Sequence, residues 1–296
     1  FSESSWELFT EIHSPNAIDK APASKPAASP GKAAAPASKP AAAADKAAAP
    51  QSKPATAAGK TGAASKSASP AGKAAAKDPF ALPVTRFQLP SGMTVLLHRD
   101  TTLPQVVVSL WFDVGSRDER PGRTGFAHLY EHLMFMGTTN VPNGGFDQIM
   151  EAEGGFNNAT TSTDRTFYYD VGPAHLLGTL LWLEAERLTA LPSAMTDQKV
   201  GLQREVVRNE RRQSYENRPY GRAELLINES LYPQGHPYSW PVIGSHADLM
   251  AASTEDVKQF FYKHYVPSNA TLTIAGDFDP AEARKLVDRY FAWMPK

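Results

Sequence analysis

Two histidines four residues apart, with a glutamate directly before the second, form the part of this sequence best suited to chemistry. The stretch HLYEH runs from His128 to His132 and contains Glu131. Because each residue of an α-helix turns by about 100°, these three side chains would fall within one arc of about 100°. Imidazoles at positions i and i+4 lie on one face of a helix, where both can bind a single cation.

The residue types favour zinc as that cation. Zinc binds imidazole nitrogen and carboxylate oxygen, and a catalytic zinc site uses three protein ligands plus water. The chain contains no cysteine, so His, Asp or Glu must hold any metal. Glu131 cannot easily be a third ligand from the same turn and is better placed as a general base for water. The spacing matches the inverted motif H-x-x-E-H of zinc peptidases.

The alternative is an apolar helix that carries a few polar residues by accident. A single histidine on such a helix is usually a hydrogen-bonded core residue. Here three ionisable groups share one face of a segment otherwise rich in Phe, Leu and Met. Burying them without partners would be costly, so the metal site is the favoured interpretation.

A helix predicted from Asp197 to about Tyr215 offers a third ligand. Glu210 shares a face of it with Val206 and Val207, and a glutamate on an apolar stripe needs a partner such as zinc. A surface ion pair with a nearby arginine is the alternative. Glu205 points about 140° away from Glu210 on the same helix and is expected to be solvated or ion-paired.

Strands and helices are mixed along the globular part of the chain, which begins near residue 80. The predicted strands cover residues 84–89, 93–100, 105–115, 156–162, 165–172 and 269–278. The predicted helices cover residues 124–137, 146–153, 174–191, 197–215, 254–265 and 279–294. Hairpins between neighbouring strands favour an α+β fold, with a largely antiparallel sheet packed with helices.

The segment before this domain has a different composition. Residues 18–79 are rich in Ala, Lys, Pro and Ser, with ten lysines and one acid from Lys20 to Lys77. A segment with so little apolar surface is predicted to be a disordered linker, preceded by an N-terminal peptide of unknown role, residues 1–17. The lysines would suit an anionic envelope surface, which favours a periplasmic or cell-envelope location. The first residue is Phe, so a signal peptide cannot be assigned or excluded.

Bulk properties exclude two other classes of function. The formal net charge of −1 indicates no nucleic-acid partner. No apolar run approaches the length of about 18 residues that a transmembrane segment needs.

Further stretches occur with HLYEH in a recognisable order, and together they resemble the catalytic N-terminal domain of the pitrilysin family of zinc metallopeptidases. The resemblance runs from about Val84 to Lys296 and includes a glutamate 78 residues after the second histidine. These stretches are Asp113–Ser116, Gly125–His132, Asn158–Thr160, Asn209–Glu210, Asn269–Leu272 and Gly276–Asp277.

The resemblance implies a role for each site residue. Glu131 would be the general base, and the strand around Asn158 and Ala159 would pair with the backbone of a peptide substrate. Composition alone favours an ordinary hairpin for that strand. The implied zinc ligands are His128, His132 and Glu210.

Two features depart from the family pattern. Gln203 stands where the family often carries a supporting glutamate, although an amide can still donate a hydrogen bond. Family members also pair this domain with a second, similar one, in the same chain or a partner subunit, which supplies an Arg and a Tyr.

The expected function is therefore a zinc endopeptidase domain that acts on extended or unfolded peptides. The first alternative is a half-enzyme or subunit that is inactive until a second pitrilysin-like domain or partner subunit completes the site. The second alternative, a non-catalytic assembly protein of the same fold, is disfavoured because all four site residues are present.

Overall fold

The computed structural model describes residues 82–296. The predictions for residues 1–17 and 18–79 lie outside the described residues. In the described part of the chain, no helix combines the length and the apolar composition needed to cross a membrane.

Six strands form one sheet in the order β1-β2-β6-β3-β5-β4. β2 and β6 pair in parallel, and all other neighbours pair antiparallel. The strands are β1 (Thr85–Gln88), β2 (Thr94–Arg99), β3 (Gln105–Phe112), β4 (Phe156–Thr161), β5 (Thr166–Pro173) and β6 (Ala270–Gly276). The predicted α+β class with a largely antiparallel sheet is confirmed, and β4 is the terminal strand on one side.

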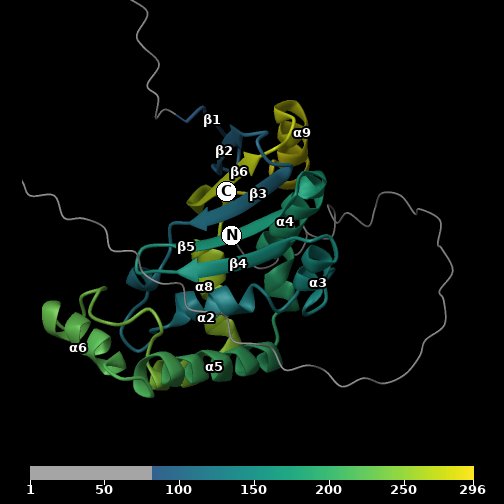
Figure 1. Cartoon of the computed structure of the whole chain (residues 1–296). Helices are drawn as coiled ribbons and strands as arrows, with labels where there is room; N and C mark the ends of the chain where they lie inside the picture. The colour runs from purple at the N-terminus through teal and green to yellow at the C-terminus, as the bar shows by residue number, and fades with distance from the viewer. Residues whose placement is uncertain (1–81) are drawn as a thin grey trace, which may run out of the picture. The chain divides into compact units, whose positions relative to one another are not determined.

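Side chains alternate along the central strand β3 between a buried and a more open face. Val106, Val108, Leu110 and Phe112 are fully buried, whereas Trp111 between them is 44% exposed. The buried face is covered by helices, and Figure 1 shows α4 and α8 behind the strands. The principal core helices are α2 (Phe126–Leu133), α4 (Leu177–Ala194), α8 (Thr254–His264) and α9 (Pro280–Phe291).

The second group of helices lies beyond the edge strand β4, where α5 contacts α2 (Figure 1). This group consists of α5 (Asp197–Arg211), a π-helical turn (Arg212–Glu216), α6 (Gly221–Leu231) and α7 (His246–Ala251), and α3 (Gly145–Ala152) contacts β4. The short helices α6 and α7 were not predicted from the sequence. α2 is shorter than predicted because Gly125, at φ +87°, precedes its first residue and the regular helix ends at Leu133.

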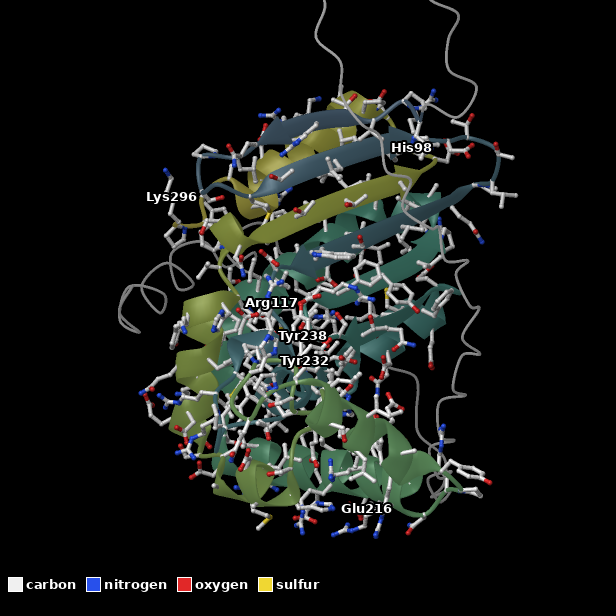
Figure 2. The ribbon with its side chains drawn as sticks, turned by 90° about the vertical axis from the view of Figure 1, so that its left-hand side faces the viewer. His98, Arg117, Glu216, Tyr232, Tyr238 and Lys296 are labelled. Carbon is white, nitrogen blue, oxygen red and sulfur yellow. The ribbon has the colours of Figure 1, made fainter. Side chains whose placement is uncertain are left out.

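The chain after α6 returns to the turn between β4 and β5. The Tyr238 hydroxyl donates to Asp164 Oδ1 at 2.6 Å, and Arg117 donates to the same oxygen at 3.2 Å. Figure 2 shows Tyr238 beside Arg117, with Tyr232 next to it. These contacts fix the β4–β5 turn, and thereby the end of β4 that lies nearest to α2.

One arginine is fully buried in the core on α4. Arg187 forms an ion pair with Glu184 at 3.1 Å, and its guanidinium lies 4.9–5.2 Å from the ring centres of Phe135, Phe146 and Tyr168. A second buried carboxyl group, that of Asp170, interacts with both charged residues, and burial raises its pKa. The aromatic rings supply the cation with favourable contacts that water would otherwise provide.

Candidate metal centre

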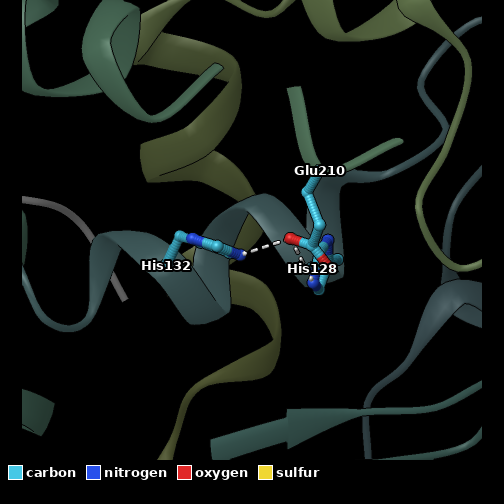
Figure 3. Close-up of side chains that lie close together, drawn as sticks. All are labelled: His128, His132 and Glu210. Atoms are coloured by element: carbon cyan, nitrogen blue, oxygen red, sulfur yellow. Dashed lines mark ion pairs between the residues drawn. The ribbon is translucent and has the colours of Figure 1, made fainter. Parts of the chain in front are cut away.

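The two histidines of α2 and the glutamate near the end of α5 converge at one point. Glu210 Oε2 lies 3.3 Å from His132 Nε2 and 3.7 Å from His128 Nε2, as Figure 3 shows. One donor atom from each of the three residues lies within 4.8 Å of the others, and no other such group of three was found among residues 82–296. The structure therefore brings together residues that are 78 positions apart.

The spacing and the donor types fit a zinc ion. Two ligand atoms at 2.0–2.2 Å from one ion, at a tetrahedral angle, lie about 3.4 Å apart. The observed separations of 3.3 and 3.7 Å bracket that value. His128 Nδ1 is buried without a hydrogen-bond partner among the described residues, so no strong competing bond orients this ring away from an ion.

Protonation also suits a cation. Burial, together with the neighbouring His132, lowers the pKa of His128 to about 4, with Glu210 opposing the change. Burial acts to raise the pKa of Glu210, but the hydrogen bond from His132 and the charges of both histidines outweigh it and lower the pKa overall. Near neutral pH the cluster thus presents a neutral imidazole at His128 and an ionised carboxylate, the forms that bind metals.

Glu131 lies beside this cluster and faces the edge strand. Its Oε2 accepts a short hydrogen bond from the Thr161 hydroxyl at the end of β4. Burial raises the pKa of Glu131 above its ordinary value, and the bond from Thr161 opposes that change. A carboxylate held in this way and raised in basicity is suited to accept a proton.

A buried carboxylate holds the first turn of α2. Glu119 Oε2 accepts from the Gly125 N–H at 2.9 Å, and Oε1 accepts from the Ala127 N–H at 2.8 Å. The first N–H groups of a helix have no partner within the helix, and the two carboxyl oxygens of Glu119 accept from N–H groups at this helix start. Glu119 therefore fixes the start of the helix that carries His128.

The strand expected to bind substrate lies at the sheet edge, next to α2. Asn158 is exposed and Ala159 is 7% exposed. The Ala159 N–H donates to Asn158 Oδ1 at 2.8 Å. In this strand it is Thr161, rather than Asn158 or Ala159, that contacts Glu131.

Two neighbours of Glu210 on α5 have other partners. Gln203 donates to Met136 Sδ at 2.7 Å. Glu205 forms an ion pair with Arg208 at 2.6 Å, which agrees with the expectation that it is solvated or ion-paired. The amide at position 203 thus anchors α5 to the segment after α2.

Sequence reasoning missed Thr161 and Glu119. A signal for Glu119 was available, because an acid shortly before a helix start is a common partner for its free N–H groups. Thr161 offered no such signal, since its contact joins a strand to a helix 30 residues earlier.

A histidine pair and a glutamate on two helices beside a largely antiparallel sheet are the features expected of a metallopeptidase domain. A family model described as insulinase (peptidase family M16) matches residues 94–237, and one described as peptidase M16 inactive domain matches residues 251–296. The chain belongs to the insulinase, or pitrilysin, family M16, which confirms the resemblance noted from the sequence.

Comparisons of sequence and of structure both find proteins similar to this chain. A zinc protease of Helicobacter pylori, PqqE, is 34% identical over 186 residues, which cover 63% of this chain and 41% of that protein. The beta subunit of the mitochondrial-processing peptidase of Blastocladiella emersonii is 27% identical, covering 72% of this chain and 44% of that protein. A crystal structure of a Helicobacter pylori protease superimposes with a TM-score of 0.69 at 31% identity, covering 72% of this chain and 51% of that one. The chain thus spans about half the length of these relatives.

Proposed function

We propose that this domain is the catalytic part of a zinc-dependent endopeptidase that hydrolyses extended or unfolded peptides. The proposal is carried by the convergence of His128, His132 and Glu210 within 4.8 Å, with Glu131 held beside them. Relatives that are named zinc proteases support it.

Each residue of the cluster has a separate role in this proposal. His128, His132 and Glu210 would hold the zinc ion, which when bound polarises the scissile carbonyl and acidifies water. Glu131 accepts the proton that the attacking water loses, and later gives it to the nitrogen of the leaving amine. The Thr161 hydroxyl keeps that carboxylate directed towards the space between α2 and β4.

The free edge of β4 is the proposed place for the peptide. An extended segment can pair with an unpaired strand edge through backbone hydrogen bonds, which give affinity for many sequences. The N–H of Ala159, now bonded to the Asn158 side chain, would be one donor available to the peptide after a side-chain rotation. The reacting bond would then lie close to Glu131.

We further propose that a second pitrilysin-like domain, in the same chain or a partner subunit, completes the site. This chain spans 41% and 51% of two relatives, and the Glu210 side chain remains 41% exposed. The alternative of a half-enzyme, inactive by itself, rests on the same observations.

Two variants test the proposed roles. Glu131→Gln should leave one zinc ion bound per chain and reduce hydrolysis of an unfolded peptide by about 10²–10⁴-fold. Glu210→Gln should weaken zinc binding, whereas Glu205→Gln on the same helix should bind zinc like the unaltered protein.

Metal analysis keeps the test valid if the chain by itself is inactive, because zinc content does not depend on turnover. Hydrolysis is measured for the chain alone and after addition of a second-half domain from a relative. An unaltered chain that binds no zinc, or a Glu131→Gln protein of full activity, would refute the proposal.

A further inference from the structure

Residues 241–248, called here loop 241–248, form a loop and the first turn of α7, and they contact both helices that carry the clustered side chains. The backbone of loop 241–248 touches the start of α2 so closely that a Cβ atom on Gly244 would lie 2.4 Å from Gly125 Cα. In the other direction, a Cβ atom on Gly125 would lie 2.9 Å from Gly244 Cα. Two glycines, both at positive φ, are therefore needed for this approach, since any side chain would separate the two segments.

Hydrogen bonds hold the loop to the α2 side of this contact. Asp248 Oδ2 accepts from the Thr124 N–H at 3.0 Å and from the Thr124 hydroxyl at 2.6 Å. The Ser245 N–H donates to the same hydroxyl at 3.1 Å. Because Thr124 directly precedes Gly125, these bonds set where α2 begins.

A second set of bonds holds the loop to the end of α5. Arg211 donates to the Gly244 carbonyl at 2.6 Å and to Glu216 Oε1 at 3.2 Å. His246 Nε2 lies 3.0 Å from that same carboxylate oxygen. Figure 2 shows Glu216 beside the lower helices, away from the sheet. Arg211 directly follows Glu210, so the bond to Gly244 acts within one residue of the proposed third ligand.

We propose that loop 241–248 is a positioning segment for the metal centre, in which Gly244 and Arg211 fix the separation of α2 from α5. The inference rests on the proposed zinc site. His128 and His132 come from one helix and Glu210 from the other, so their mutual distances depend on that separation. Ligand distances must hold to about 0.2 Å for tight binding, and this segment is bonded both to the start of α2 and to the end of α5.

A purely structural role for the loop makes a different prediction. Any packed loop contributes to stability, and its loss would lower the melting temperature whatever its distance from the ligands. A positioning role predicts weaker zinc binding beyond that expected from lost stability. The two can be separated by a matched variant on the same helix.

Arg204 provides the control. It lies on α5 and donates to the carbonyl groups of Met250 and Ala252 at 3.1 and 2.8 Å. These two residues lie at the C-terminal end of α7, whereas Gly244 precedes its first residue. The bonds of Arg204 resemble that of Arg211 to Gly244 in kind, but they are nearly two helical turns away from Glu210. Arg211→Met and Arg204→Met should therefore cost comparable stability.

The experiment measures the dissociation constant for zinc alone, by competition with a chromophoric chelator, and the melting temperature of each metal-free protein. Arg211→Met is expected to weaken zinc binding by about 10- to 100-fold, as is usual when a group that orients a metal ligand is lost, and Arg204→Met by no more than about twofold. Arg211→Lys should recover part of the affinity. Asp248→Ala tests the other end of the loop if Arg211→Met does not fold.

Three results would overturn the inference. Zinc binding by both Arg211→Met and Asp248→Ala could match that of the unaltered protein, or Arg204→Met could weaken it as much as Arg211→Met. In either case the unaltered chain still binds zinc, so the proposed function stands. Failure of the unaltered chain to bind zinc would overturn the proposed function and this inference together.

Discussion

The carboxyl group of Glu119 holds the start of the helix that carries the histidines, and its titration provides a test of that role. Its two oxygens accept the N–H groups of Gly125 and Ala127, and the residue is only 9% exposed. Burial raises the pKa of Glu119 from 4.5 to about 8, against the opposing influence of the backbone hydrogen bonds. The perturbation is Glu119→Gln, because glutamine keeps the shape but does not titrate.

The direction of the pH dependence follows from the order of the two pKa values. The folded pKa lies above the unfolded value, so the folded state takes up a proton between the two. The stability that this linkage contributes is full below the unfolded pKa of 4.5 and is lost as the pH rises towards 8. A rise of that size corresponds to roughly 5 kcal/mol, an upper value for a group that also accepts two backbone bonds.

Urea unfolding of the two proteins, with a chelator present to remove metal linkage, measures the effect. Between about pH 5 and about pH 8, the free energy of unfolding of the unaltered protein should fall relative to Glu119→Gln by a few kcal/mol. A difference that stays constant across this range would refute the reasoning. A difference that grows with pH only below about pH 5, and then stays constant, would show that the backbone N–H groups hold Glu119 ionised in the folded state.

Three further predictions follow from the core and the site. Thr161→Val removes the donor to Glu131 and should lower the turnover rate by about 10- to 100-fold with unchanged zinc content; an unchanged rate measured on a peptide substrate would contradict it. Arg187→Leu leaves the carboxyl groups of Asp170 and Glu184 buried without a cation and should cost about 3–5 kcal/mol. A thermal melt of this variant within about 2 °C of the unaltered protein would speak against that role. Zinc at about a thousand times its dissociation constant should stabilise the chain by about 4 kcal/mol over the chelated form, and identical melting temperatures would exclude a metal linking α2 to α5.

The elements that could be predicted from the sequence are those with local signals. Turn residues marked the β1–β2 and β4–β5 hairpins, a run rich in β-branched residues marked β3, and a long stretch of helix-forming residues marked α4. The place of β6 between β2 and β3 could not be predicted, because these pairings join residues at least 158 positions apart. α6 was missed because it exposes Leu226 and Ile227, which are 59% and 54% accessible, so its apolar residues form no single buried stripe.

The candidate site was likewise predictable only where its residues carry a local signal in the sequence. The spacing of His128 and His132 within one predicted helix indicated that the two side chains lie on the same face. Glu210 was inferred from an apolar stripe that the structure shows only in part, since Val207 is buried but Val206 is 40% exposed. The loop that bonds to both α5 and α2 has no periodic sequence pattern, because its contacts are single side-chain hydrogen bonds and one close approach of two glycines.

The position of β4 at the edge of the sheet also has a consequence for aggregation. A strand edge that can receive a peptide backbone can equally receive the same edge of another copy, and exposed edges of this kind promote aggregation. β4 is six residues long and has the sequence FNNATT, in which two asparagines disfavour strand formation. Its weak intrinsic preference for pairing would keep the edge free, so Asn158→Val should increase self-association of the protein.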